Sequence, residues 1–363
     1  MELSFEQRCL LWLSTAEIPA KRVASLTARY GSAEEIWRRY GEISITSAHK
    51  NKAILDEYHN PEAIDRLVER LEKSHVHLLF QSDDRYPLLL NEIQDPPYLL
   101  YYSGNLSCLQ MPCIAVVGTR TPSEYGRHMA RVLGRDLAQA GVCVVSGLAR
   151  GIDIAAHQGV LDADGTTVGI LGSGINVPYP SEHAPTMRKI AGGKGLILSE
   201  FPLDATPTTY HFPYRNRIIS GLCVATVFVE GRIKSGGMHT VSSALDQGRE
   251  VFAVPGQTGY LGAEGPLAIM REGARLITGA ADILEDLAIV PRKQQAASQS
   301  MTANALSPVQ KQIAELLRIE PMSIDDLSVR SGLNTELLIS ETGLMEIMGL
   351  IRREAGNRFV VNL

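Results

Sequence analysis

No apolar run in the 363-residue sequence approaches the roughly 20 residues that a helix needs to span a bilayer. The five cysteines are widely spaced, odd in number and form no Cys-x-x-Cys pair, which argues against a disulfide framework and a zinc site. Near its start the chain carries Glu2 and Glu6, where a secretory signal would carry lysine or arginine. We therefore expect a cytoplasmic protein with reduced thiols, no membrane segment and no metal.

Positive charge is also scarce, because Asp and Glu outnumber Lys and Arg and the formal net charge is −5. A nucleic-acid-binding surface would therefore have to be a local cluster of cations. Neither a Walker A loop nor Gly-x-Gly-x-x-Gly is present, since Val177 stands where the third glycine after Gly172 and Gly174 would be. We therefore expect no nucleotide cofactor.

Length and pattern predict several domains, because 363 residues exceed one ordinary core. Short amphipathic stretches with glycine stops predict a small helical domain over residues 1–73, of SAM-like or helix-hairpin-like type. A larger domain follows at 74–290. Residues 291–305, rich in Gln, Ala and Ser, predict a flexible linker, and 306–363 predict three helices and a terminal hairpin.

Strand-like apolar runs alternate with helical stretches from Cys113 onward. This alternation is typical of βαβ units and predicts an α/β fold with a largely parallel sheet. Upstream, Pro61–Lys73 predicts a helix and His77–Phe80 a strand. The predicted strands of the alternating region are Ile114–Val117, Val142–Val145, Thr167–Leu171, Leu196–Leu198, Val224–Val229, Glu250–Val254 and Arg275–Ile277.

The first strand of this region ends at Gly118, and Arg120 follows two residues later. A helix is predicted to begin at Pro122, with Thr121 as its N-cap and Glu124 three residues after the cap. Ligands of open parallel sheets bind where strand ends face helix starts. Because Glu124 would repel phosphate at this helix start, Arg120 is the better phosphate contact. The alternative is a surface arginine on a tight turn.

Glycine-rich turns follow three other predicted strands. They are Ser146–Asp153, which contains Arg150, then Gly172–Gly174, and Glu230–Gly237. Glycines allow backbone N–H groups to approach an anion closely, although glycines also simply form tight turns. Four such turns on one sheet edge, with cations beside them, favour an anion-binding site.

The stretch Tyr210–Gly221 interleaves aromatic residues with arginines and an asparagine. Such a composition suits a single-stranded nucleic acid, with ring faces for the bases and guanidinium groups for the phosphates. In the alternative interpretation Phe212 belongs to the core and Arg215 and Arg217 form ion pairs. Composition alone does not decide between them.

Five ordered motifs extend across the α/β region. They read Val-Val-Gly-Thr-Arg at 116–120, Ser-Gly-Leu-Ala-Arg-Gly-Ile-Asp-x-Ala-Ala-His at 146–157, Phe-Pro-x-Arg-Asn-Arg-Ile-Ile-Ser-Gly-Leu at 212–222, Gln-Gly-Arg-Glu-Val-Phe-Ala-Val-Pro-Gly at 247–256 and Glu-Gly-Ala at 272–274. Together they resemble the DNA-processing protein A (DprA or Smf) family. The resemblance covers the whole α/β region and its lead-in.

The resemblance implies a non-enzymatic recombination mediator that binds and protects incoming single-stranded DNA and loads the RecA recombinase during natural transformation. It also implies a homodimer, an extended Rossmann-like core without cofactor, and a C-terminal winged-helix-like domain. The expected DNA-binding residues are Gly118, Thr119, Arg120, Arg150, Gly172, Ser173, Gly174, Tyr179, Ser181, His183, Phe212, Arg215, Asn216 and Arg217. Self-association and RecA docking are expected near Leu245, Leu267 and Leu276.

Two features qualify these expectations. After Tyr-Pro the family often has a lysine or arginine, but this chain has Ser181 and Glu182, so Arg188, Lys189 or another cation would have to replace a phosphate contact. The third predicted helix of the C-terminal domain, about residues 334–348, contains glutamates but no lysine or arginine. A helix that reads a DNA groove should offer cations and amides, so we expect a protein-binding or packing module.

An enzyme and a structural scaffold are the two alternatives. The enzyme would resemble the LOG-type nucleoside-monophosphate phosphoribohydrolases, which carry a Pro-Gly-Gly-x-Gly-Thr-x-x-Glu motif. Ser235–Thr240 echoes that motif, but Ser243 stands where the catalytic glutamate would be. A scaffold without ligands would leave the arginines near the strand ends without a purpose.

Overall fold

The computed structural model describes the chain except residues 1, 291–306, 348–349, 355–357 and 362–363. The chain divides into two compact units, Met1–Ile289 and Val290–Leu363. The linker proposed at 291–305 lies outside the described residues. None of the described helices combines the length and the apolar character needed to cross a membrane.

A nine-stranded sheet runs through the first unit in the order β1-β2-β6-β5-β4-β3-β7-β8-β9. All neighbours from β6 to β9 in this order are parallel, whereas β1 and β2 pair antiparallel at the other edge. The strands predicted for the alternating region all form, so the α/β prediction is confirmed. Their bounds are β1 His77–Phe80, β2 Leu99–Gly104, β3 Cys113–Val117, β4 Cys143–Ser146, β5 Thr167–Ile170, β6 Leu196–Ser199, β7 Ala225–Phe228, β8 Glu250–Ala253 and β9 Arg275–Leu276.

Helices cover both faces of the sheet, because successive side chains of a strand point to opposite sides. In β3, Ile114 and Val116 pack in the core that includes α7, α8 and α13. Ala115 and Val117 pack in the opposite core with α10, α11 and α12. The helices of this region are α6 Leu88–Asn91, α7 Glu124–Gln139, α8 Ile152–Asp162, α9 Ala184–Ala191, α10 His211–Gly221, α11 Gly236–Asp246, α12 Glu264–Arg271 and α13 Ala280–Asp286.

The start of α7 differs from the prediction. Ser123, not Thr121, is the N-cap, and its hydroxyl accepts a hydrogen bond from the Gly126 N–H at 3.0 Å. The same hydroxyl and the Ser123 N–H donate to the carboxylate of Glu230, at 2.6 and 2.9 Å. These long-range hydrogen bonds fix Ser123 as the cap, and a local sequence pattern could not have revealed them.

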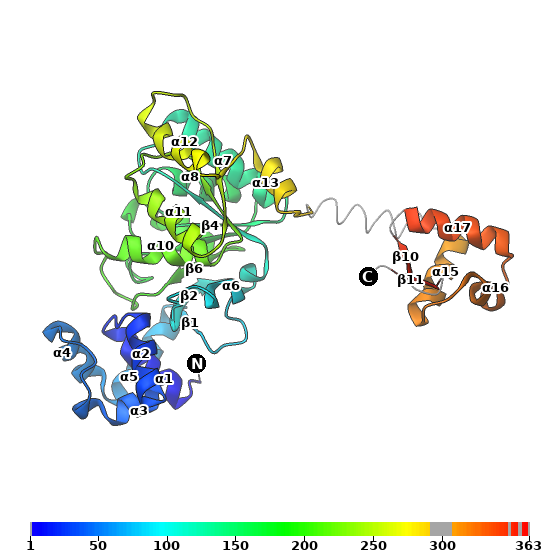
Figure 1. The fold of residues 1–363 in the computed structure, drawn as a ribbon. Coiled ribbons are helices and arrows are strands. Elements are labelled where there is room, and N and C mark those ends of the chain that lie inside the picture. The colour runs from blue at the N-terminus through cyan, green and yellow to red at the C-terminus, as the bar shows by residue number, and fades with distance from the viewer. Residues whose placement is uncertain (1, 291–306, 348–349, 355–357, 362–363) are drawn as a thin grey trace. The chain divides into compact units, whose positions relative to one another are not determined.

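Five helices precede the sheet and pack together at its β1–β2 end (Figure 1). The helix predicted over Pro61–Lys73 forms with those bounds, with proline in its first turn. β2 is an addition to the predicted strands. Its residues Leu99–Tyr102 are buried, and the Tyr101 hydroxyl lies 2.6 Å from the Ser14 hydroxyl. The helices are α1 Phe5–Thr15, α2 Ala20–Tyr30, α3 Ala33–Arg38, α4 His49–Tyr58 and α5 Pro61–Lys73.

The second unit contains the predicted three helices and hairpin. They are α15 Pro308–Ile319, α16 Ile324–Ser331, α17 Thr335–Ile347, β10 Ile351–Glu354 and β11 Arg358–Val361. β10 and β11 pair antiparallel, and Ile313, Leu327, Leu338 and Phe359 belong to one small core. This arrangement is a winged helix, as the resemblance implied.

Candidate functional site

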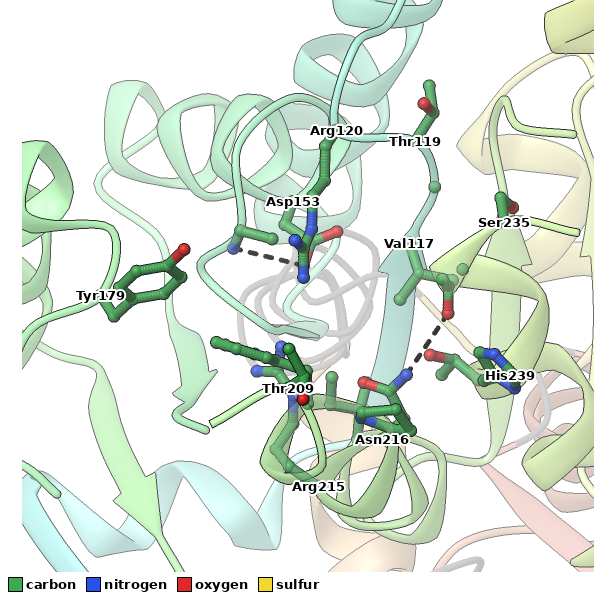
Figure 2. A pocket seen from close by; sticks show the side chains of 18 residues that line it. Val117, Thr119, Arg120, Asp153, Tyr179, Thr209, Arg215, Asn216, Ser235 and His239 are labelled. Atoms are coloured by element: carbon green, nitrogen blue, oxygen red, sulfur yellow. Dashed lines mark hydrogen bonds between the residues drawn. The ribbon is translucent and has the colours of Figure 1, made fainter. Parts of the chain in front are cut away.

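The candidate site lies where the order of parallel strands reverses. β3 is followed in the sequence by β4, but its other neighbour is β7, and ligands of such sheets bind at the carboxyl ends of the strands beside the reversal. A cavity of about 520 Å³ lies there (Figure 2). It is lined by Val117, Gly118, Thr119, Arg120, Ala149, Asp153, Tyr179, Thr209, Phe212, Pro213, Arg215, Asn216, Ile219, Ser235, Gly236, Gly237, His239 and Thr240.

Gly118 and Thr119 fix the turn after β3. A Cβ atom on Gly118 would lie 2.6 Å from the carbonyl oxygen of Glu230, and the Thr119 N–H donates to that same oxygen at 2.7 Å. The Thr119 N–H is therefore already occupied and is not available to an anion. Glycine is required here because the backbones of two neighbouring strand ends meet without space for a side chain.

Arg120 is exposed and extends into the cavity in Figure 2. Its guanidinium carbon lies 5.2 Å from the centroid of the Phe212 ring. The Phe212 and Tyr179 ring centroids lie 5.3 Å apart, and Tyr179 is 40% exposed. Three of the predicted residues, from three separate segments, thus place an exposed cation beside two aromatic rings.

Arg215 and Asp153 form a buried part of the lining, at 4% and 7% exposure. Arg215 donates hydrogen bonds to the carbonyl oxygens of Gly147 and Ile170, and burial lowers its pKa to about 10. Asp153 accepts hydrogen bonds from the Gly147 and Ala149 N–H groups. Burial raises the pKa of Asp153, and the positive charge of Arg215 opposes that rise. Since these two charges offset each other, Arg120 supplies the exposed charge of the lining.

The cavity is also lined by residues that were not among the expected DNA-binding residues. Asn216, which was expected, donates its side-chain amide to the Gly236 carbonyl at 3.4 Å, and His239 and Ser235 lie nearby on the segment that begins α11 (Figure 2). Ser235 and Asp153 fall within the glycine-rich turns of the sequence, so their positions carried a signal. His239 falls within the Ser235–Thr240 stretch that echoes the enzyme motif, whereas Thr209 belongs to none of the patterns found in the sequence.

Arg150 and the turn after Tyr179 lie at the edge of the cavity. Arg150 lines a small adjoining pocket together with Arg120 and Tyr179. Its guanidinium donates to Glu182 at 2.5 Å, and this hydrogen bond lowers the pKa of the Glu182 carboxyl. The chain therefore lacks a cation that the family often carries after Tyr-Pro, and Glu182 in addition pairs with the cation of Arg150.

The residues on either side of Glu182 do not line the cavity. Ser181 is exposed, and the His183 Nδ1 lies 2.8 Å from the Leu148 carbonyl oxygen. Neither cation proposed as a replacement contributes to the lining, since Arg188 and Lys189 lie exposed on α9. Neither Arg188 nor Lys189 therefore replaces, within the cavity, the cation that the family often has after Tyr-Pro.

The turn Gly172–Gly174 is buried behind the cavity. The Gly174 N–H donates to the Ala205 carbonyl at 2.8 Å, and the Ser173 hydroxyl donates to the Val177 carbonyl at 2.7 Å. A Cβ atom on Gly172 would lie 2.9 Å from the Phe212 ring. This turn therefore packs against Phe212, and none of its three residues lines the cavity. Their expected contact with DNA stays a prediction.

Arg217 does not line the cavity. It donates to Glu200 at 2.7 Å, lies 3.5 Å from Asp95 and stacks over Tyr214, with its guanidinium carbon 4.1 Å from the ring centroid. Its side chain is 12% exposed. The ion-pair interpretation thus describes Arg217, whereas Phe212, Arg215 and Asn216 line the cavity.

Comparison with known proteins identifies the family. The family model of DNA recombination-mediator protein A matches residues 77–288, and that of the DprA winged helix domain matches residues 296–357. Protein Smf of Synechocystis sp. is 30% identical, with 96% of this chain and 97% of that protein covered. Protein Smf of Escherichia coli is 43% identical, and the match spans 60% of this chain and 58% of that protein's length.

Solved structures agree with these matches. DNA processing protein A of Streptococcus pneumoniae superposes with a TM-score of 0.66 at 30% identity, covering 78% of this chain and 98% of that one. The Helicobacter pylori protein superposes with a TM-score of 0.53 at 28% identity, covering 58% and 95%. The sheet, the winged helix and the matched residues lead to one conclusion: the chain belongs to the DNA processing protein A family.

Proposed function

We propose that this chain binds single-stranded DNA in the cavity beside Arg120 and serves as a mediator that protects incoming DNA and loads RecA during natural transformation. The observation that carries the proposal is the position of Arg120. Arg120 is exposed, forms no ion pair with any residue that the structure describes, and lies against Phe212 with Tyr179 beyond. This arrangement matches what a nucleotide presents: a phosphate next to a base.

The family adds independent support. The Helicobacter pylori structure was determined for the single-stranded DNA binding mode of DNA processing protein A from that organism. In the present chain, a cavity of about 520 Å³ that opens to solvent between separate loops has room for part of a flexible strand. A rigid duplex keeps its bases stacked inside, so the rings of Tyr179 and Phe212 would gain little from it.

The test is a fluorescence anisotropy titration of the full chain with a labelled oligothymidine and with a blunt duplex of equal length, over a range of salt. We expect tighter binding of the single strand and a steep fall of its affinity with salt. Equal affinity for the duplex, or an affinity that salt does not change, would refute the proposal.

The enzyme alternative is tested by incubating the protein with nucleoside monophosphates and assaying for released base. We expect no release. At the position of the missing glutamate, Ser243 cannot stabilise an oxocarbenium-like transition state as a carboxylate would. Base release that disappears in the Asp153→Asn variant would instead favour the enzyme.

We also propose that the β9 edge mediates the homodimer. Leu276 on β9 is 54% exposed and Leu245 on α11 is 55% exposed, while Leu267 on α12 is half-buried. A sheet edge with exposed leucines is open to pairing with a second copy. Leu276→Glu should convert the dimer to monomer in sedimentation equilibrium, whereas the exposed Leu88, at the α6 side of the unit, serves as the control in Leu88→Glu.

A further inference from the structure

A second cavity, of about 590 Å³, is lined by residues at the start of α7 and in the segments that follow β7 and β8. Its lining includes the rings of Tyr125 and Tyr260, the prolines Pro255 and Pro266, and the carboxylate of Glu230. Tyr125 and Tyr260 are 50% and 42% exposed. The Tyr125 hydroxyl donates to the Pro255 carbonyl at 3.0 Å, which holds that ring at the edge of the cavity.

Glu230 is buried, with 4% of its surface exposed. One carboxylate oxygen accepts from the Ser123 N–H at 2.9 Å and from the Tyr260 hydroxyl at 2.8 Å. The other accepts from the Ser123 hydroxyl at 2.6 Å. All three donors are neutral, and in the described part of the chain no lysine, arginine or histidine forms an ion pair with Glu230.

The three neutral donors hydrogen-bond the Glu230 carboxylate but bring no positive charge to it, so a cation in the cavity would still be attracted. The other described residues of the lining cannot neutralise the Glu230 carboxylate, since they include no basic side chain. A cation that entered the cavity would meet the Glu230 carboxylate and two half-exposed tyrosine rings in the same lining. Both arrangements stabilise cations in proteins, and guanidinium most of all.

We propose that this cavity binds the guanidinium group of an arginine on a basic partner protein. The planar guanidinium can stack on Tyr125 or Tyr260 and donate to the remaining acceptor capacity of the Glu230 carboxylate. A nucleotide fits the cavity less well, because its phosphate would enter a lining that carries negative charge and no cation. The inference does not depend on DNA binding at Arg120.

The proposal is tested by NMR on the full chain, labelled at tyrosine, with N-acetyl-arginine amide as the probe. N-acetyl-citrulline amide is the matched control, because it has the same shape without the charge. We expect arginine amide to shift the Tyr125 and Tyr260 signals saturably, and citrulline amide to bind at least about tenfold more weakly, or ~1.4 kcal/mol. Equal binding of the two probes, no binding of either, or tighter binding of guanosine at these tyrosines would overturn it.

Variants show whether arginine amide binds in this cavity or is attracted by surface carboxylates in general. Glu230→Gln should weaken arginine amide binding at least about tenfold, whereas Glu264→Gln, which removes an exposed carboxylate outside the lining, should leave it unchanged. If Glu230→Gln does not fold, Tyr125→Ala decides, because it removes a half-exposed ring whose hydroxyl donates to the Pro255 carbonyl and not to Glu230. Unchanged binding in a folded Glu230→Gln, or in Tyr125→Ala, contradicts the proposal.

Discussion

The guanidinium of Arg120 lies 5.2 Å from the centre of the Phe212 ring, although β3 and α10 are far apart in the sequence. Neither residue alone would form a surface suited to a nucleotide. Arg120 without the ring would be one more surface arginine, and Phe212 without the cation would be a partly buried core residue. Their contact joins a residue that follows a strand end and a residue in the first turn of a helix into one surface, which offers a charge and a ring to the same nucleotide.

Replacing Arg120 by alanine should weaken single-stranded DNA binding and flatten the slope of log affinity against log salt by about 0.7, as expected for one lost phosphate contact. Because Arg120 is exposed and unpaired in the described part of the chain, its removal should leave the melting temperature unchanged. Arg127→Ala is the matched control, since Arg127 is an exposed arginine that pairs with Glu124 outside the cavity. If Arg120→Ala binds with wild-type affinity and slope, the turn after β3 is structural and DNA binds elsewhere.

Replacing Gly172 by alanine tests the ring without altering any charge. The new Cβ would lie 2.9 Å from the Phe212 ring, so the ring has to move. We expect weaker DNA binding with an unchanged salt slope, because stacking is lost while every phosphate contact remains. Gly41→Ala, at a position with open space around the added Cβ, should bind like wild type. A Gly172→Ala variant with a flattened slope would show that the ring position controls the cations as well.

The sequence predicted the parallel strands well, because strands buried on both faces appear as short apolar runs between glycines. It also placed Arg120 at a strand end. It could not decide between the two interpretations of α10, and the structure shows why. Arg215 and Arg217 are two positions apart, so they point to different sides of one helix. Which side faces the cavity depends on Glu200 and Asp95, which other parts of the chain supply.

Long-range partners account for the other differences as well. Ser123 became the cap of α7 because Glu230, beyond β7, accepts its hydrogen bonds. The Gly174 N–H is not free to bind an anion, because it already donates to the Ala205 carbonyl. In each case the local pattern was correct about the turn, and a distant residue determined what the turn does.

Arg217→Ala should destabilise the first unit rather than report on DNA. Arg217 and Glu200 have side chains only 12% and 10% exposed, and removing one member of such a buried pair costs about 3–5 kcal/mol because the other charge remains buried. Urea unfolding should therefore show a large loss of stability. Arg38→Ala, which breaks an exposed pair with Glu35, should change it little. An unchanged unfolding free energy for Arg217→Ala would mean that the pair contributes nothing, and Arg217 would again become a candidate for DNA contact.

The protein should lose stability as the pH falls, because burial disfavours the protonated form of His157 in the folded state. The ring is fully enclosed, and its Nδ1 lies 2.8 Å from the Thr167 hydroxyl. Since that hydroxyl donates its proton to the Val144 carbonyl, Nδ1 is the donor in the contact between His157 and Thr167. Burial lowers the pKa of His157 from its ordinary 6.5 to about 3.

Between these two pKa values the unfolded chain binds a proton that the folded chain does not. The contribution of His157 to stability is therefore complete above pH 6.5 and declines as the pH falls toward 3, by up to ~1.4 kcal/mol per pH unit. His157→Gln, which keeps a donor but cannot titrate, should remove that part of the slope when urea unfolding is measured from pH 7 to pH 4. His49→Gln, an exposed histidine at the start of α4, controls for the loss of any imidazole. Parallel stability curves for wild type and His157→Gln would mean that the folded protein takes up the proton, and that the buried imidazole is not held neutral.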